Sequence, residues 1–413
     1  MYLTRNGKAF YTECMIGHIK FNRMELAGSL GDLGTLLPLA IGMILINGLN
    51  PTGLIMTVGI FYIVSGLYFK VTCPVEPMKV IGAYAVATGI TASQIQASCF
   101  LIFLFLLIIG GTHLISLVGR YVPKPVIRGV QLSTGVLLVS QGVRLMIGNS
   151  RFQLIHQAAE PYLTIQSVAG LPIGLFVGVL LGLLTLLLLE NKRFPAALVV
   201  VGAGALVGAV FGTREAMEQI RIGVHLPEWL PFGLPSGADF SFALLVLVLP
   251  QIPMTLGNAV IANADLSIQY FPQDGRRVTY RALCLSMAWA NLLSFFLGGM
   301  PMCHGAGGLA SRYRFGARTA GSNIIIGSIF LFLAIFLGAH ALAIIYTLPM
   351  AALGILLIFA GAQLALTIMD LQTRKAFFVP MLVLGITLAS NLAAGFLAGI
   401  AIAYLLKWNR ISV

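Results

Sequence analysis

The feature that most constrains this chain is a succession of long apolar segments. Charged residues make up only 9% of its 413 residues, whereas soluble domains carry about 25% charge. A membrane-spanning helix needs about 20 mostly apolar residues, so the sequence predicts an all-α integral membrane protein. The apolar segments are 24–46, 51–69, 92–118, 126–147, 168–189, 194–211, 240–268, 280–299, 320–339, 342–366, 376–389 and 391–406.

Two further segments, 71–89 and 300–316, are interrupted by proline and glycine, which raises the expected number of crossings to about 14. Such backbone is tolerated in a membrane only where it is buried in protein or lines a cavity. The first contains Pro74-Val75-Glu76-Pro77-Met78-Lys79, and the second contains Pro301-Met302-Cys303-His304-Gly305-Ala306-Gly307-Gly308.

The interruptions predict two half-helices that face each other. Pro77 suits the first turn of a helix, and the glycines after His304 allow a ligand to approach backbone N–H groups. If crossings 3 and 10 are half extended and half helical, their helix N-termini form an anion site near the membrane centre. The alternative is a pair of kinked helices that pack through small residues.

The polar connection 212–239 divides the chain into seven segments before it and seven after it. An odd number in each half makes the second half run opposite to the first, which is typical of an inverted repeat. We therefore expect a single membrane domain over residues 1–413. Repeat one covers about 20–211 and repeat two covers about 240–408.

Lys and Arg residues are distributed unevenly between alternate loops. With the N-terminus inside, 20 of the 25 fall on the inner side and Lys79 falls within a crossing. This positive-inside pattern accounts for the net charge of +12 without a nucleic-acid partner. It predicts a multi-pass protein of the cell (inner) membrane with both termini cytoplasmic. The outer side receives Arg144, Arg151, Arg214 and Arg221.

Residues 1–23 lack a continuous apolar core, so no cleaved signal peptide is expected. Five cysteines without paired spacing argue against a disulfide framework. The sequence shows no zinc spacing, phosphate-binding loop or nucleophile motif. We therefore predict no cofactor, no metal and no enzymatic activity.

Ionisable residues at membrane depth are functional candidates by default. Lys79 follows the first break, where it can pair with an anion or with Glu76. His304, at the second break, is a candidate anion donor or proton carrier. Glu76 is either a proton-coupling carboxylate or the fixed partner of Lys79. The alternative for each is a structural polar group whose hydrogen bonds are satisfied within the protein.

Two polar stripes run along otherwise apolar helices. Glu25 and Asp32 are seven residues apart in the first crossing, and Gln251, Asn258 and Asp265 follow the same spacing in the eighth. Residues seven apart share one helical face, which must contact protein or water. Thr255 lies one turn from Gln251. The stripes predict either substrate contacts or interhelical hydrogen bonds.

The string Arg312-Tyr313-Arg314-Phe315-Gly316-Ala317-Arg318 ends crossing 10. An anion exit funnel is one interpretation. We favour a solvated anchor at the inner face, because basic residues gather there in membrane proteins generally.

Three runs resemble the molybdate transporter 1 family, a branch related to the sulfate permeases. They are Glu25-Leu-Ala-Gly-Ser-Leu-Gly-Asp-Leu-Gly-Thr35, Pro74-Val-Glu-Pro-Met-Lys79 and Pro301-Met-Cys-His-Gly-Ala-Gly-Gly308, with Tyr313-Arg-Phe-Gly316 after the last. The resemblance implies a 7+7 inverted repeat with core and gate domains and a substrate held between crossings 3 and 10. It also implies high-affinity oxyanion uptake without a cytoplasmic regulatory domain. The family usually has Gln where this chain has Glu76.

The predicted function is secondary active transport of a tetrahedral oxyanion. Molybdate is the first candidate substrate, and the sequence leaves open whether transport is coupled to protons. The alternatives are a sulfate transporter of the same fold, a nucleobase–proton symporter and an anion channel. The expected partners are the oxyanion, protons and the bilayer. The sequence leaves open whether the protein forms a homodimer. Candidate substrate-binding residues are Asp32, Thr35, Glu76, Pro77, Met78, Lys79, Gln251, Thr255, Asn258, Cys303, His304, Gly305, Ala306 and Gly307; Glu76, His304 and Asp32 are the candidates for proton coupling.

Overall fold

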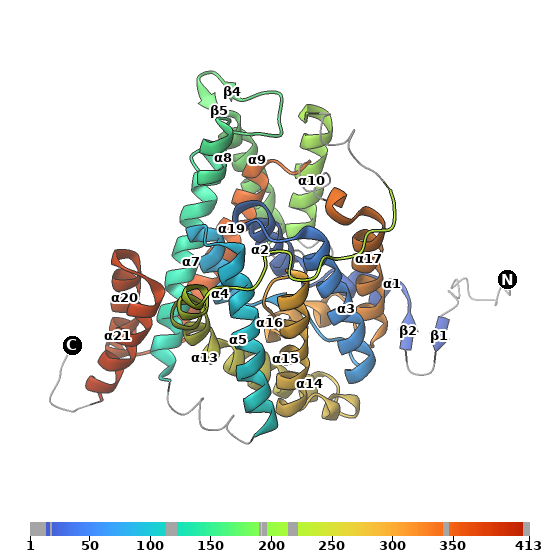
Figure 1. The fold of residues 1–413 in the computed structure, drawn as a ribbon, viewed down its shortest axis with the longest axis vertical. Helices are drawn as coiled ribbons and strands as arrows, with labels where there is room; N and C mark the ends of the chain where they lie inside the picture. The colour runs from blue at the N-terminus through green and yellow to red at the C-terminus, as the bar shows by residue number, and fades with distance from the viewer. Residues whose placement is uncertain are drawn as a thin grey trace.

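The computed structural model describes residues 14–16, 19–112, 122–189, 191, 196–213, 222–341 and 347–407. The fold is predominantly helical (Figure 1). The helices of the first half are α1 (Arg23–Ser29), α2 (Leu33–Asn47), α3 (Pro51–Phe69), α4 (Lys79–Thr88), α5 (Ala92–Gly111), α7 (Lys124–Met146), α8 (Arg151–His156), α9 (Ile173–Leu188) and α10 (Ala196–Phe211).

The second half begins with a continuous helical stretch from Gly237 to Tyr270. It consists of α12 (Gly237–Phe242), the π-helix η1 (Ala243–Val248), α13 (Leu249–Met254), the π-helix η2 (Thr255–Ala262) and α14 (Asn263–Tyr270). The remaining elements are the 3₁₀ turn η3 (Asp274–Arg277), α15 (Tyr280–Leu297), α16 (Ala306–Arg314), α17 (Gly321–Leu337), the 3₁₀ turn η4 (Gly338–His340), α19 (Met350–Ala365), the 3₁₀ turn η5 (Leu366–Asp370), α20 (Arg374–Ala389) and α21 (Leu392–Leu405).

Strands are few and short. Three antiparallel pairs are present in the described part of the chain. They are β1 (Cys14–Ile16) with β2 (Ile19–Phe21), β3 (Glu76–Pro77) with β6 (Met302–Cys303), and β4 (Ser167–Val168) with β5 (Leu171–Pro172). The β3–β6 pair joins the two broken segments, which lie about 225 residues apart.

Among the described residues, seven helices are long and apolar enough to cross a membrane, or eight if the bent pair α1–α2 counts as one span. The first expected crossing, 24–46, is not one straight helix, because the chain bends by 41° between α1 and α2. The helices α4, α9, α10 and α21 are apolar but shorter. The total of 14 crossings stays a prediction.

The most extensive helix contacts join the two halves of the chain. α7 packs on α19, α5 on α15, and α3 on α17. The first pair approaches through glycines: a Cβ on Gly142 would overlap the carbonyl oxygen of Gly354, and one on Gly361 that of Gly135. Small residues at such contacts let helix backbones approach closely.

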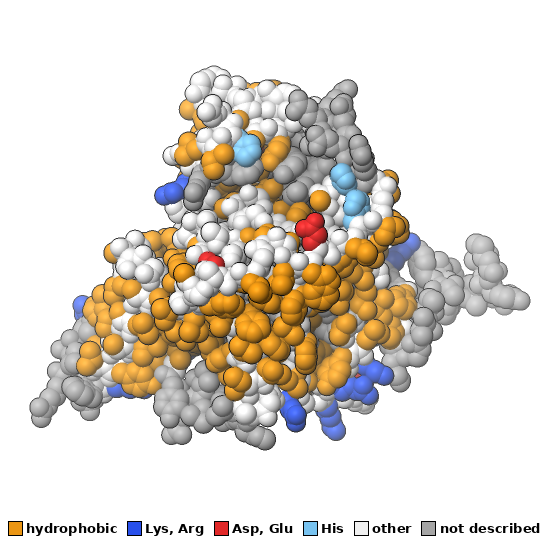
Figure 2. Space-filling view, in the orientation of Figure 1, with side chains coloured by type: hydrophobic (Ala, Val, Ile, Leu, Met, Phe, Trp, Pro, Cys, Tyr) orange, Lys and Arg blue, Asp and Glu red, His pale blue; other side chains and the backbone are white. Residues whose placement is uncertain are grey.

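Apolar side chains form a wide band across the face of the molecule that Figure 2 shows. In this view Lys and Arg side chains are most numerous at its lower edge, with some at the sides and upper left, whereas most of the visible acidic and His side chains lie above it (Figure 2). This separation agrees with the charge asymmetry of the loops. Arg214 and Arg221, which we assign to the outer side, lie outside the described residues.

Candidate functional site

The two broken segments lie side by side at the centre of the molecule. Glu76 pairs with Cys303 and Pro77 with Met302 in the β3–β6 ladder, and the Met78 N–H donates to the Pro301 oxygen at 2.8 Å. Each segment then becomes helical, α4 at Lys79 and α16 at Ala306. The extended-then-helical form is what the prolines and glycines predict.

Two asparagines hold the extended backbone in place. Asn323 of α17 accepts from the Cys73 N–H at 3.0 Å and donates to its carbonyl oxygen at 2.7 Å. Asn291 of α15 makes the same two bonds with Met302, at 3.1 and 2.9 Å. Each amide satisfies one donor and one acceptor of backbone that would otherwise be buried unpaired. Sequence reasoning missed both residues.

Arg312 is fully buried, and its interpretation as part of a solvated anchor is wrong. Because Leu309 and Arg312 are three residues apart, they share the face of α16 that packs into the protein. All three guanidinium nitrogens are bonded. Their acceptors are Thr72 Oγ1 at 2.8 Å, Asp32 Oδ1 at 3.0 Å, the Ser29 oxygen at 3.2 Å, Ser322 Oγ at 3.1 Å and Asn323 Oδ1 at 2.8 Å.

Asp32 is the acidic partner of that network. Its Oδ1 contacts Arg312, and its Oδ2 accepts from the Val75 N–H at 3.1 Å. Both oxygens are therefore used within the protein. Glu25, its partner in the first polar stripe, accepts instead from the backbone N–H groups of Arg318 and Thr319. The stripe thus ties α1 and α2 to the ends of α16 and α17.

Glu76 and Lys79 lie where the two helix starts meet. Glu76 is 1% exposed, and its Oε1 accepts from the Thr35 hydroxyl at 2.9 Å. Its Oε2 is 3.2 Å from Lys79 Nζ and has no other hydrogen-bond partner among the described residues. Lys79 keeps 19% of its side-chain surface exposed.

The carboxylate of Glu76 lies directly against the start of α16. A Cβ on Gly305 would overlap Glu76 Oε2, and one on Gly308 would lie 2.8 Å from Oε1. Both positions therefore require glycine, because the Glu76 carboxylate lies too close to leave room for a Cβ atom. The negative carboxylate is held at the positive end of the α16 dipole, where an anion is stabilised.

Gln251 caps the other helix start. Its Oε1 accepts from the N–H groups of Val80 and Ile81 at 2.9 and 3.3 Å, and its Nε2 donates to Thr255 Oγ1 at 2.9 Å. The first turn of α4 thus has two of its unpaired donors satisfied. Gln251 acts on the site through α4 in this conformation.

His304 is fully enclosed behind the strand pair. Its Nδ1 is 2.7 Å from the Pro74 oxygen, and its Nε2 is 2.9 Å from Ser286 Oγ. The Phe61 ring packs against it at 4.5 Å between centroids. These neighbours favour a role in holding the break in shape. Anion donation and proton transfer by His304 stay predictions.

Two cavities meet at Lys79. One has a volume of about 440 Å³ and extends between α2, α9, α10 and α16. The other, about 520 Å³, extends between α7, α19 and the Pro253–Ala262 region. These volumes lie within the usual range for small-molecule sites. Both cavities are lined by Thr35, Lys79, Gly307, Ala360 and Gln363.

The cavities separate the predicted residues into two groups. Thr35, Glu76, Lys79, Asn258 and Gly307 line at least one of them. Gln363 of α19 is an additional polar wall residue that sequence reasoning missed. The predicted residues that line neither are Asp32, Pro77, Met78, Gln251, Thr255, Cys303, His304, Gly305 and Ala306.

The overall fold matches that of solved membrane transporters. The transmembrane domain of the cyanobacterial bicarbonate transporter BicA superposes with a TM-score of 0.62 at 16% identity, covering 92% of this chain and 97% of that one. Murine Slc26a9, an anion transporter, superposes with a TM-score of 0.65 at 15% identity, covering 93% and 68%. The chain therefore shares the predominantly helical fold of these two proteins.

The sequence comparisons identify the family. A model described as the molybdate transporter of the MFS superfamily matches residues 24–138 and 243–364. Molybdate transporter 2 of Arabidopsis thaliana is 30% identical over 417 residues, covering 94% of this chain and 88% of its own length. The chain belongs to the molybdate transporter family. It is a multi-pass membrane protein and an anion transporter, and it is not an enzyme.

Proposed function

We propose that this protein is a secondary active transporter for a tetrahedral oxyanion, with molybdate as the first candidate. The observation that carries the proposal is the convergence of α4, α16 and the Lys79 ammonium on the wall shared by two cavities. Helix N-termini and a lysine together attract an anion. Membership of the molybdate transporter family supports molybdate, and sulfate is the alternative because it has the same shape and charge.

The proposed anion position is beside Lys79, between Thr35 and Gly307, with Asn258 within reach from the second cavity. Unpaired backbone donors of α16 and the lysine ammonium supply hydrogen bonds to the oxyanion. Asp32, Gln251 and Asn323 position the two helix starts without contacting the substrate. Gln363, on the opposite wall, comes from α19.

We further propose that Glu76 carries the coupled proton. A carboxylate beside Lys79 cancels the positive charge that a dianion requires, and two helix ends supply only about +0.5 each. Protonation of Glu76 removes that repulsion and adds an O–H donor. Glu76 binds its proton on the outer side together with the anion and releases it inside.

The proposed topology has 14 crossings in two inverted halves, with both termini cytoplasmic, in the cell (inner) membrane. The loop charges and the basic lower edge in Figure 2 support it. The helix contacts support it too: when the second half is mapped onto the first, the pair α3–α17 corresponds to the pair α5–α15. Helices α7, α9, α10 and α19–α21 form the gate, and the remainder forms the core. A homodimer is the proposed assembly.

Binding calorimetry with molybdate, tungstate and sulfate on the purified protein tests the substrate. We expect saturable binding of at least one of them, and of molybdate most tightly. Uptake into proteoliposomes should saturate with concentration, whereas a channel would give currents that rise linearly with driving force. A nucleobase–proton symporter would be expected to have a carboxylate where this chain has Gln251, so a nucleobase serves as the negative control ligand.

A further inference from the structure

An apolar groove of about 440 Å³ lies on the protein's exposed surface between α3 and α15, away from the two cavities that meet at Lys79. Each of its walls is a stripe of residues four apart, which lie on one helical face. Several wall residues are strongly exposed, with Tyr68 and Trp289 at 59% each. The stripes are Ile60, Val64 and Tyr68 on α3, and Leu285, Trp289 and Leu293 on α15.

One end of the groove runs into a group of unpaired cations. Arg281 continues the α15 stripe one turn before Leu285, and Lys70 ends α3 two residues after Tyr68. The adjoining turn η3, which contacts α3, adds Arg276 and Arg277. All four side chains are exposed. Within the described part of the chain, none of them has a hydrogen-bond or ion-pair partner.

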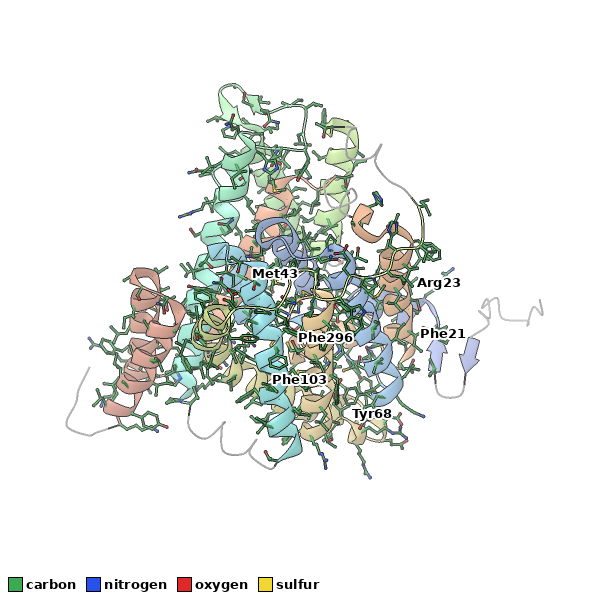
Figure 3. All side chains as sticks on the ribbon, in the orientation of Figure 1. Phe21, Arg23, Met43, Tyr68, Phe103 and Phe296 are labelled. Carbon is green, nitrogen blue, oxygen red and sulfur yellow. The ribbon has the colours of Figure 1, made fainter. Side chains whose placement is uncertain are left out.

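The acidic residues near this end of the groove do not neutralise the positive charge of the four basic residues. Asp265 and Asp274 are the acids nearest in sequence, against four basic residues. Asp265 accepts a hydrogen bond from the Tyr280 hydroxyl at 3.1 Å. Figure 3 shows Tyr68 at the lower end of α3, and Figure 2 shows basic side chains along this lower edge. The cations therefore lie at the groove end that meets the polar boundary of the apolar band.

We propose that this groove binds one anionic phospholipid, with an acyl chain between α3 and α15 and the phosphate at Lys70 and Arg281. In a membrane protein the apolar band faces the bilayer, so an acyl chain is the molecule that fills the groove. The unpaired cations select the headgroup by charge. Basic residues at the inner face of a membrane protein are common. Here they lie at the end of an apolar groove, so the headgroup and the acyl chain of one lipid can bind together.

The floor of the groove touches the residues that support the broken segment. Ser286 and Phe61 both line the groove. Ser286 Oγ is 2.9 Å from His304 Nε2, and the Phe61 ring packs on the same imidazole. His304 in turn contacts the Pro74 oxygen. A lipid in the groove thus packs against two of the side chains that contact His304 at the second break.

Tryptophan quenching by brominated lipids tests the proposal. Replacing Trp229 and Trp408 by Phe leaves Trp289, in the groove wall, as the sole reporter. The full chain is reconstituted into vesicles of phosphatidylglycerol and phosphatidylcholine, with bromine on the acyl chains of one lipid at a time. We expect the brominated phosphatidylglycerol to quench more strongly at equal mole fraction, with a preference of about fivefold for each basic residue that contacts it.

The double variant Lys70→Gln/Arg281→Gln should abolish that preference. Arg374→Gln is the matched control, because Arg374 is exposed at the start of α20 and away from the groove. Native mass spectrometry of the unsubstituted chain, counting retained lipids of each class, gives a second readout. Equal quenching by both lipids overturns the headgroup selection, and no quenching by either overturns the groove as a lipid site. Neither outcome bears on oxyanion transport.

Discussion

Two buried carboxylate–cation pairs lie close together in this protein and differ in their surroundings. Asp32 and Arg312 are 3.0 Å apart, and neither side chain is exposed. Glu76 and Lys79 are 3.2 Å apart, and Lys79 is partly exposed to both cavities. The first pair joins residues 280 positions apart, whereas the second joins residues three positions apart, one in β3 and one at the start of α4.

The difference lies in the remaining hydrogen bonds. Arg312 has an acceptor for every nitrogen, and both oxygens of Asp32 are used. Glu76 Oε2 has only the lysine. A fully bonded ion pair can neither release a proton nor accept a ligand without breaking the network. A pair with spare bonding capacity beside a cavity can do both. The surroundings of a charge pair, more than its burial, separate a structural role from a functional one.

The largest expected effect comes from breaking the structural pair. Arg312→Met leaves Asp32 buried and unpaired, which costs about 3–5 kcal/mol of folding free energy. Thermal unfolding of the detergent-solubilised protein should show a large drop in midpoint or no folded protein. Arg374→Met, at an exposed position at the start of α20, is the control and should change little. A wild-type midpoint for Arg312→Met would contradict the structural assignment.

Glu160 sharpens the comparison, because it is a buried carboxylate with no cationic partner among the described residues. It accepts from the N–H groups of Met350 and Ala351 at the start of α19, at 2.7 and 2.8 Å. Burial raises its pKa from 4.5 to about 7. The native state therefore holds this proton more firmly than the unfolded chain does.

Consequently, the free energy of unfolding should fall as pH rises from about 4.5 to 7, by about 3 kcal/mol at most. Glu160→Gln should flatten that slope, since glutamine does not titrate and still accepts one of the two bonds. Unfolding midpoints measured across this pH range provide the test. A slope that persists in the variant would assign the pH dependence to another group.

Breaking the functional pair should affect binding more than folding. Lys79→Gln removes the ammonium from the anion position and should weaken oxyanion binding by about 1 kcal/mol or more. Calorimetry measures the change. The double variant Glu76→Gln/Lys79→Gln removes both charges and should fold normally while binding stays weak. Unchanged affinity in both variants would move the anion site away from Lys79.

The smallest expected effect on affinity comes from Glu76→Gln, which supplies the residue usual in the family. Binding should be retained. Wild-type uptake should fall as external pH rises, because Glu76 must be protonated to enter with the anion, whereas the variant should show a flat profile. Uptake into proteoliposomes at a series of external pH values provides the measurement. If the variant keeps the wild-type profile, another group carries the proton.

Several features of the fold were predictable from the sequence because their causes are local. Apolar segment length predicts membrane helices, and Pro77 with the glycines after His304 predicts where two of them break. Glu76 and Lys79 are only three residues apart, across the step from the extended segment to α4, so their closeness is local as well. The bend between α1 and α2 escaped prediction, since the apolar segment 24–46 contains no proline before Pro38.

Only the tertiary structure decided which polar residues face the two cavities. Helical periodicity places Arg312, Asn291, Asn323 and Gln251 on particular faces of their helices. What those faces contact depends on elements 10 to 280 positions away. Asp32 was predicted at the substrate because it belongs to a polar stripe in the first crossing, yet it bonds Arg312, whereas Thr35 lines the cavity. The sequence determines which residues share a helical face. Which other helix that face contacts is determined only when the helices pack together.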